Sequence, residues 1–219
     1  MRDSKQRAME ALSETGVVAV IRVDDPSDLY ETSCALSEGG VRLVEITMTV
    51  PGALDIIESV SKRIGEDVFI GAGTVLDSET ARLAILAGAS YIVGPSFDPE
   101  VVSMCKLYGT AVMPGALTPT EVVTAWKAGA DVVKIFPGRV GTPGYFQDLK
   151  GPLPQVKLMP TGNVNFETAG DYIKAGAVAI GVGKALVDIK AVKAKQFQVV
   201  TENAKRFREI VDQARGVEK

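Results

Sequence analysis

Short apolar segments alternate with longer amphipathic segments along almost the whole chain. Eight of the apolar segments are rich in β-branched residues and contain few polar positions, which is typical of parallel strands that are buried on both faces. They cover Val17–Ile21, Leu43–Thr47, Val68–Gly71, Tyr91–Val93, Ala111–Met113, Val132–Phe136, Lys157–Met159 and Val178–Gly181. The intervening segments are predicted to be helices.

Capping signals mark the start of several predicted helices. A capping side chain comes directly before a proline at three places, and proline is well tolerated at the first helical position. Glu121 completes a capping box with the third of these caps. Asn165 is expected to cap the helix after the seventh strand. The three cap–proline pairs are Asp25-Pro26, Asp98-Pro99 and Thr118-Pro119.

Eight strands, each followed by a helical segment, predict an α/β fold of the (β/α)8 TIM-barrel type. We expect a single domain over residues 1–219, with an extra N-terminal helix at about residues 4–14 and an amphipathic helix over Lys193–Arg215 that closes the barrel. An open, doubly wound sheet is the alternative. The first strand is not followed by the Gly-x-Gly-x-x-Gly motif that would favour it.

An internal repeat supports the barrel and gives its phase. Helices ending in glycine precede the second, fourth, sixth and eighth strands, at intervals of about 40 to 50 residues. Five residues beyond three of these glycines lie Glu45, Lys134 and Gly181. Alternate strands of a barrel contribute to the same interior layer. Glu45 and Lys134 are therefore expected to point into one layer from facing walls, with Gly181 leaving space.

Lys134 lies in an otherwise apolar strand, and two interpretations are open. It can be structural, either reaching water along its stem or held in an ion pair. Alternatively it is a desolvated nucleophile that forms a Schiff base with a carbonyl substrate. Glu45 poses the same question, because a buried ion pair is costly to desolvate and is weak evidence of stability. As the charged neighbour in the predicted layer, Glu45 is the candidate for moving protons during Schiff-base formation.

Composition narrows the chemistry. The chain has no histidine, which excludes Ser-His-Asp and Cys-His nucleophile systems and removes the usual ligand of catalytic zinc. We therefore predict no metal site. We also predict no cofactor. A net charge of −3 without a basic tract argues against nucleic acid as a partner. The first residues lack the apolar core that a signal peptide would have, and no apolar run approaches membrane-spanning length, so neither feature is expected. Cys34 and Cys105 are isolated and are expected to be reduced packing residues in a cytoplasmic protein.

The ends of the predicted strands supply candidate binding residues. Arg22 follows the first strand and could clamp a carboxylate or pair with Asp24 or Asp25. Gly71-Ala-Gly-Thr74 either lets the backbone approach a ligand or forms an ordinary tight turn. The loops after the seventh and eighth strands commonly form a phosphate site in this fold. Here they read Met159-Pro-Thr-Gly-Asn163 and Gly181-Val-Gly-Lys184.

Five motifs in order resemble those of the 2-keto-3-deoxy-6-phosphogluconate (KDPG) aldolase/4-hydroxy-2-oxoglutarate (KHG) aldolase family of class I aldolases. The resemblance runs from about Gly16 to Leu186. The motifs are Val44-Glu-Ile-Thr47, Gly71-Ala-Gly-Thr-Val75, Val133-Lys-Ile-Phe-Pro137, Met159-Pro-Thr-Gly162 and Gly181-Val-Gly183.

The resemblance implies a metal-independent homotrimer that cleaves a 2-keto-3-deoxy-6-phospho sugar acid to pyruvate and glyceraldehyde 3-phosphate. It also implies that Lys134 forms the Schiff base and that Glu45 is the general acid/base. The resemblance further implies that Thr74 and Phe136 line the pyruvate pocket and that the loops at Gly162 and Gly183 hold the phosphate. We add Thr47 and Thr161 within the motifs, Asn163 and Lys184 in the phosphate loops, and Arg22 as a hypothetical carboxylate ligand.

Three positions depart from the family pattern. Some members carry an arginine where this chain has Thr49, the second glycine of the Thr-Gly-Gly loop is Asn163, and the usual serine after Gly-x-Gly is Lys184. The alternatives are therefore a 4-hydroxy-2-oxoglutarate aldolase, or an aldolase for the C4-epimeric 6-phosphogalactonate acid. Outside this class remain a phosphosugar epimerase or isomerase, and a non-catalytic phosphosugar-binding barrel.

Overall fold

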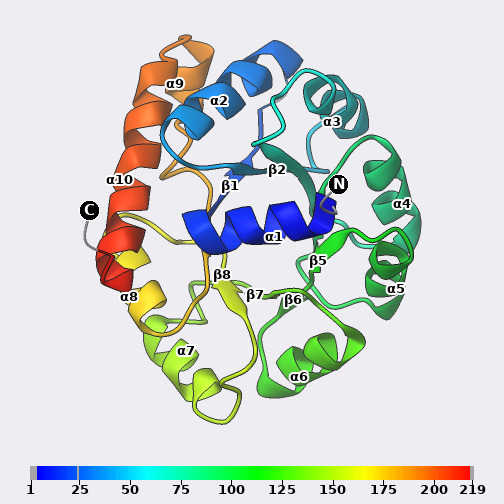
Figure 1. Cartoon of the computed structure of the whole chain (residues 1–219), viewed down its shortest axis with the longest axis vertical. Helices are drawn as coiled ribbons and strands as arrows, with labels where there is room; N and C mark the ends of the chain where they lie inside the picture. The colour runs from blue at the N-terminus through cyan, green and yellow to red at the C-terminus, as the bar shows by residue number, and fades with distance from the viewer. Residues whose placement is uncertain (1–3, 24, 218–219) are drawn as a thin grey trace.

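The computed structural model describes residues 4–23 and 25–217 and has the predicted (β/α)8 barrel architecture, with helices surrounding a ring of parallel strands (Figure 1). One sheet has the strand order β5-β4-β3-β2-β1-β9, and a second has the order β6-β7-β8. The strands are β1 Val17–Ile21, β2 Leu43–Thr47, β3 Phe69–Gly73, β4 Tyr91–Val93, β5 Ala111–Met113, β6 Gly115–Ala116, β7 Val133–Ile135, β8 Leu158–Pro160 and β9 Ile180–Val182.

Two features join the sheets into a closed ring. The fifth predicted strand is β5, and a further short strand, β6, follows it in the second sheet after Pro114, which has no N–H to donate to a ladder. On the other side, a parallel bridge between Thr161 and Gly181 links β8 to β9. The predicted sixth, seventh and eighth strands are therefore β7, β8 and β9, with boundaries shifted by one or two residues.

Except for the N-terminal helix, the helices cover the outside of the ring (Figure 1). None in the described part of the chain is long and apolar enough to cross a membrane. They are α1 Ser4–Thr15, α2 Pro26–Glu38, α3 Ala53–Ser61, α4 Ser78–Leu86, α5 Pro99–Leu107, α6 Pro119–Ala128, α7 Pro143–Lys150, α8 Ala169–Lys174, α9 Ile189–Lys193 and α10 Phe197–Arg215.

The predicted caps are confirmed at three helices and wrong at one. Asp25, Asp98 and Thr118 accept backbone hydrogen bonds at the starts of α2, α5 and α6, and Glu121 completes the capping box. Asn165 does not cap α8. Its side chain accepts a hydrogen bond from the backbone N–H of Thr168 and closes a turn that precedes the helix.

The predicted C-terminal helix over Lys193–Arg215 is also wrong in its extent. The helix is interrupted between α9 and α10, where Lys195 adopts a left-handed conformation with φ 58°. The amphipathic pattern continues through this break because buried side chains on both helices face the same barrel. Periodicity alone therefore did not reveal the interruption.

The N-terminal helix α1 lies across one end of the ring (Figure 1). Its buried side chains, Ala8, Ala11 and Leu12, belong to the same apolar cluster as inward-facing side chains from the starts of the strands, including Val18 and Leu43. The helix therefore covers the N-terminal mouth of the barrel. The predicted extra helix is confirmed.

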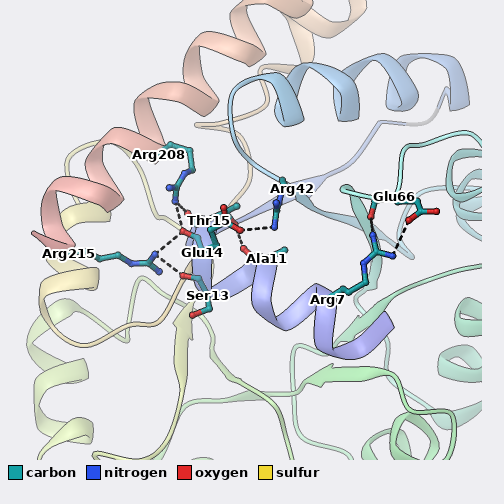
Figure 2. Close-up of polar contacts among 9 residues, drawn as sticks. All are labelled: Arg7, Ala11, Ser13, Glu14, Thr15, Arg42, Glu66, Arg208 and Arg215. Atoms are coloured by element: carbon teal, nitrogen blue, oxygen red, sulfur yellow. Dashed lines mark hydrogen bonds and ion pairs between the residues drawn. The ribbon is translucent and has the colours of Figure 1, made fainter. Parts of the chain in front are cut away.

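Two arginines of α10 hold the end of α1 in place (Figure 2). Arg208 donates to the carbonyl oxygens of Glu14 and Thr15, and Arg215 donates to those of Ser13 and Glu14. These carbonyls have no partner within the helix because they lie in its last turn. The helix α1 therefore closes this end of the barrel.

Candidate active site

Glu45 on β2 and Lys134 on β7 both lie in the barrel interior. Their side chains are almost completely buried, with 1% and 6% of the residue exposed. Strands β2 and β7 are separated by half the ring in either direction. The facing-wall geometry expected from the glycine repeat is thus present.

The electrostatic environment of Glu45 is set by its burial and by two positively charged side chains. Burial raises the pKa of its carboxyl group, because the charged form loses hydration, while the positive charges of Lys134 and Arg22 act in the opposite direction. Its Oε2 atom is buried and has no hydrogen-bond partner among the described residues. In a purely structural ion pair, a donor would be hydrogen-bonded to that oxygen. The geometry therefore favours a carboxyl group of Glu45 that can exchange a proton.

Two glycines of β3 make room for large side chains inside the barrel. A Cβ atom on Gly73 would lie 1.9 Å from Oε1 of Glu45, and one on Gly71 would lie 2.3 Å from the ring of Tyr91. Both glycines are within the strand, so neither forms the tight turn considered from the sequence. The space they leave is taken by Glu45 and Tyr91, which differs from the expected approach of backbone to ligand.

The space expected at Gly181 is occupied as well. A Cβ atom there would come within 2.3 Å of Oγ1 of Thr161. Thr161 itself is buried, and its hydroxyl has no hydrogen-bond partner among the described residues. The side chain therefore presents an unsatisfied hydroxyl to the interior.

Several predicted binding residues cluster where strands end. Thr47 is buried and its hydroxyl lies 2.9 Å from that of Thr49. Thr74 adopts a left-handed conformation (φ 48°) directly after β3. Phe136 follows β7, is 38% exposed, and has its ring centroid 5.2 Å from Nζ of Lys134. Thr74 and Phe136 thus border the carboxyl end of the barrel, with Phe136 against the candidate nucleophile.

The two candidate phosphate loops begin side by side because the Thr161–Gly181 bridge joins their strands. In the first loop, Gly162 and Asn163 both have positive φ values, 91° and 62°. Asparagine tolerates this conformation better than most residues, so the departure from glycine preserves the backbone path. In the second loop, the carbonyl of Gly183 accepts hydrogen bonds from Leu186 and Val187.

Lys184 and Arg22 follow the neighbouring strands β9 and β1 at their carboxyl ends. Lys184 is exposed in the turn after β9, and Arg22 is exposed directly after β1. The carboxylate of Asp25, considered from the sequence as a partner of Arg22, caps α2 instead. The other pairing considered, with Asp24, lies outside the described residues. The positive charge of Arg22 opposes the effect of burial on the pKa of Glu45.

Sequence reasoning missed Tyr91. A tyrosine among apolar strand residues reads as an ordinary core side chain, and the only available signal was the glycine at Gly71 in the preceding strand. The described residues contain no group of three or more histidine, cysteine, aspartate or glutamate side chains that could hold a metal ion.

Comparisons with known proteins identify the family of this chain. The family model for KDPG and KHG aldolase matches residues 8–203. The 2-dehydro-3-deoxy-phosphogluconate aldolase of Treponema pallidum (strain Nichols) is 32% identical over 203 residues, covering 92% of this chain and 96% of that protein.

Two solved structures have similar folds. One is described as native KDPGal, with a TM-score of 0.85, 29% identity, and coverage of 91% of this chain and 96% of the other. The second is the KDPG aldolase of Legionella pneumophila with pyruvate captured as a covalent carbinolamine intermediate. It has a TM-score of 0.83 and 25% identity, and the match covers 89% of this chain and 95% of that one.

Proposed function

Because the chain belongs to the KDPG and KHG aldolase family, we propose that it is a class I aldolase in which Lys134 forms the Schiff base and Glu45 is the general acid/base. The observation that carries this proposal is the burial of both side chains in one interior, with a carboxylate oxygen left without a partner. The covalent carbinolamine in the Legionella relative supports the same chemistry.

The reaction follows from these two groups. The amine of Lys134 adds to the 2-keto carbon, and loss of water from the carbinolamine gives an iminium ion. Glu45 takes the proton of the C4 hydroxyl, the C3–C4 bond breaks, and its electron pair passes into the iminium to give an enamine and an aldehyde. Protonation at C3 and hydrolysis then release pyruvate and restore the lysine.

We propose 2-dehydro-3-deoxy-6-phosphogluconate as the substrate, which would yield pyruvate and glyceraldehyde 3-phosphate. The relative from Treponema pallidum carries this substrate in its name, and the paired loops at Gly162 and Gly183 support a phosphate site. The exposed ammonium of Lys184 supports an anionic group at the same end. Thr47, Thr74, Phe136, Thr161 and Asn163 complete the proposed binding residues.

A second candidate is the C4-epimeric 6-phosphogalactonate acid, because one structural neighbour is described as KDPGal. Cleavage of 4-hydroxy-2-oxoglutarate is a third, since the family name includes KHG. Turnover of these two acids should be compared with that of the gluconate-derived acid. Because the chain belongs to an aldolase family, we no longer consider the epimerase, isomerase and non-catalytic alternatives.

Borohydride reduction in the presence of pyruvate tests the proposal. We expect a stable pyruvyl adduct that mass spectrometry locates on Lys134, and loss of both the adduct and the cleavage activity in Lys134→Met. The matched control is Lys127→Met, on the outer helix α6, which should retain both. Failure of the wild-type protein to form an adduct at saturating pyruvate would contradict the proposal.

We further propose that the protein is a homotrimer and that it is located in the cytoplasm. Assembly is supported by exposed apolar side chains on the neighbouring helices α4 and α5 and at the C-cap of α5: Leu83, Leu86, Leu107 and Tyr108. Two free cysteines support a reducing compartment, and burial raises the pKa of the Cys105 thiol to about 12, which keeps it unreactive.

A further inference from the structure

Three oxygen atoms inside the barrel are buried without a hydrogen-bond partner among the described residues: Oε2 of Glu45 and the hydroxyls of Tyr91 and Thr161. A buried polar group left unsatisfied costs about 1–3 kcal/mol. Native proteins usually avoid this cost by placing a water or another polar group between such atoms. The unsatisfied oxygens of Glu45 and Tyr91 therefore need an explanation.

The strand register brings these two side chains onto one row. Glu45 on β2 is paired with Gly71 on β3, and Gly71 is paired with Tyr91 on β4. Because Gly71 has no side chain, the ring of Tyr91 extends over β3, where a Cβ atom would lie only 2.3 Å from its Cε2 and Cζ atoms. Any larger residue at this position would push the ring away from Glu45.

Gly73 leaves room for the carboxyl group of Glu45 to lie against β3 as well. A Cβ atom on Gly73 would lie 1.9 Å from Oε1 and 2.3 Å from Cδ of Glu45. Inward positions two residues apart on a strand are separated by about 7 Å. The phenol end of Tyr91 and the carboxyl of Glu45 thus lie against neighbouring inward positions of β3, within reach of a bridging water.

The charge distribution fits a donor–acceptor pair. Burial raises the pKa of the Tyr91 hydroxyl well above its ordinary value, and the Glu45 charge adds a smaller effect, so the phenol keeps its proton. The other charged groups that act on Glu45 are Lys134 from β7 and Arg22 from the end of β1. Neither satisfies Oε2.

We propose that Tyr91 is a positioning residue for the active-site carboxylate: its hydroxyl donates, through a buried water, to Oε2 of Glu45 and holds this group facing Lys134. The inference rests on the proposed function. A hydrogen bond to a carboxylate favours its charged form. Tyr91 therefore both orients Glu45 and opposes the effect of burial on its protonation.

The test is Tyr91→Phe, which keeps the ring against Gly71 and removes one oxygen atom. We expect kcat for aldol cleavage to fall about tenfold with little change in KM. This is less than the roughly 10²–10⁴-fold contribution of acid–base catalysis, because Glu45 itself is still present. Loss of the donor raises the pKa of Glu45 further, so the acidic limb of the kcat–pH profile should move to higher pH. The pyruvyl adduct should still form on Lys134.

The matched control is Tyr145→Phe. That hydroxyl donates to the carbonyl of Leu117, between α7 and the segment before α6, so its loss should lower thermal stability without moving the pH profile. If Tyr91→Phe has the kcat and pH profile of the wild type, with or without a loss of stability, the positioning role is overturned. Failure of the wild type to form an adduct would instead contradict the proposed function.

Discussion

At the scale of single residues, the interior of this barrel combines charges with the glycines that make room for them. Glu45 lies against Gly73, Tyr91 crosses Gly71, and Thr161 fills the space at Gly181. Each of these polar side chains has a buried oxygen without a hydrogen-bond partner among the described residues. Such an arrangement is poor for stability and suited to binding, because a ligand can satisfy groups that folding leaves unsatisfied.

Replacing Glu45 should therefore stabilise the protein while removing its activity. Because folding raises the pKa of this carboxyl, the folded state binds the proton more tightly, and the free energy of unfolding falls as pH rises from the ordinary glutamate value through the raised one. Each unit of the increase corresponds to about 1.4 kcal/mol at pH values above both. Glu45→Gln removes this loss, so its melting temperature should exceed that of the wild type at pH 8 and match it near pH 4.

The control for this prediction is Glu121→Gln, since hydrogen bonds from Thr118 and Leu117 lower the pKa of Glu121. Its stabilising contribution is present above the ordinary glutamate pKa and is lost as pH falls through the lowered value. This variant should be less stable than the wild type at pH 8. A Glu45→Gln protein that melts earlier than the wild type at pH 8 would disprove the argument.

Arg22 provides a second prediction at this scale. If its guanidinium binds the substrate carboxylate, Arg22→Ala should raise KM for the keto acid about tenfold or more, because a charged hydrogen bond contributes roughly 1.5–3 kcal/mol. Arg82→Ala, which removes an arginine bonded to Tyr108 between α4 and α5, should leave KM unchanged. An unchanged KM in Arg22→Ala would remove Arg22 from the site.

At the scale of elements, the N-terminal helix is held by α10 as well as by its own apolar face. Arg208 and Arg215 donate to carbonyls in the last turn of α1, Arg215 also reaches the carbonyl of Val178, and Arg208 pairs with Asp212. The last helix in the chain is therefore tied to the first across the covered mouth of the barrel (Figure 2).

Removing either arginine should loosen α1 without affecting chemistry at the opposite end. We expect Arg208→Ala and Arg215→Ala each to lower the free energy of unfolding by about 1.5–3 kcal/mol, the range for hydrogen bonds of charged groups. Amide exchange in α1 should accelerate while KM stays constant. Lys205→Ala, at an exposed position of the same helix, should behave as the wild type. Unchanged exchange in both arginine variants would show that apolar packing alone holds α1.

At the scale of the whole molecule, one part of the outer surface is unusually apolar. Leu107 is 79% exposed and Leu86 is 62% exposed, and they belong to adjacent helices, α5 and α4. Exposed apolar patches commonly mark protein–protein contacts. Because a cyclic trimer repeats one contact three times, a single charge in that contact acts at every interface.

Leu107→Glu should therefore dissociate the proposed trimer to monomers, measured by light scattering on a sizing column. Val217→Glu introduces the same charge at an exposed apolar position outside the patch and should remain trimeric. A wild-type protein that is monomeric would contradict the assembly itself. A Leu107→Glu protein that stays trimeric would exclude this surface as the contact.

Much of the fold and part of the candidate site could be predicted from the pattern and composition of the sequence. The apolar segments predicted the barrel, and the glycine repeat placed Glu45 and Lys134 inside it, because side-chain direction along a strand follows from a local period of two. Capping residues fixed several helix starts for the same local reason. Asn165 and Lys195 mark where this reasoning failed, since each belongs to a tight turn that the apolar periodicity passes over.

Only the closed barrel decided which inward side chains meet. The contact of Tyr91 with Gly71 and that of Thr161 with Gly181 depend on the stagger between neighbouring strands, which no period within one strand contains. The hydrogen bonds from α10 to α1 join residues about two hundred positions apart and exist only once the ring has formed. The chain by itself thus determined which residues face inward. The tertiary structure decided their neighbours, because closure of the ring sets the register between strands that are distant in sequence.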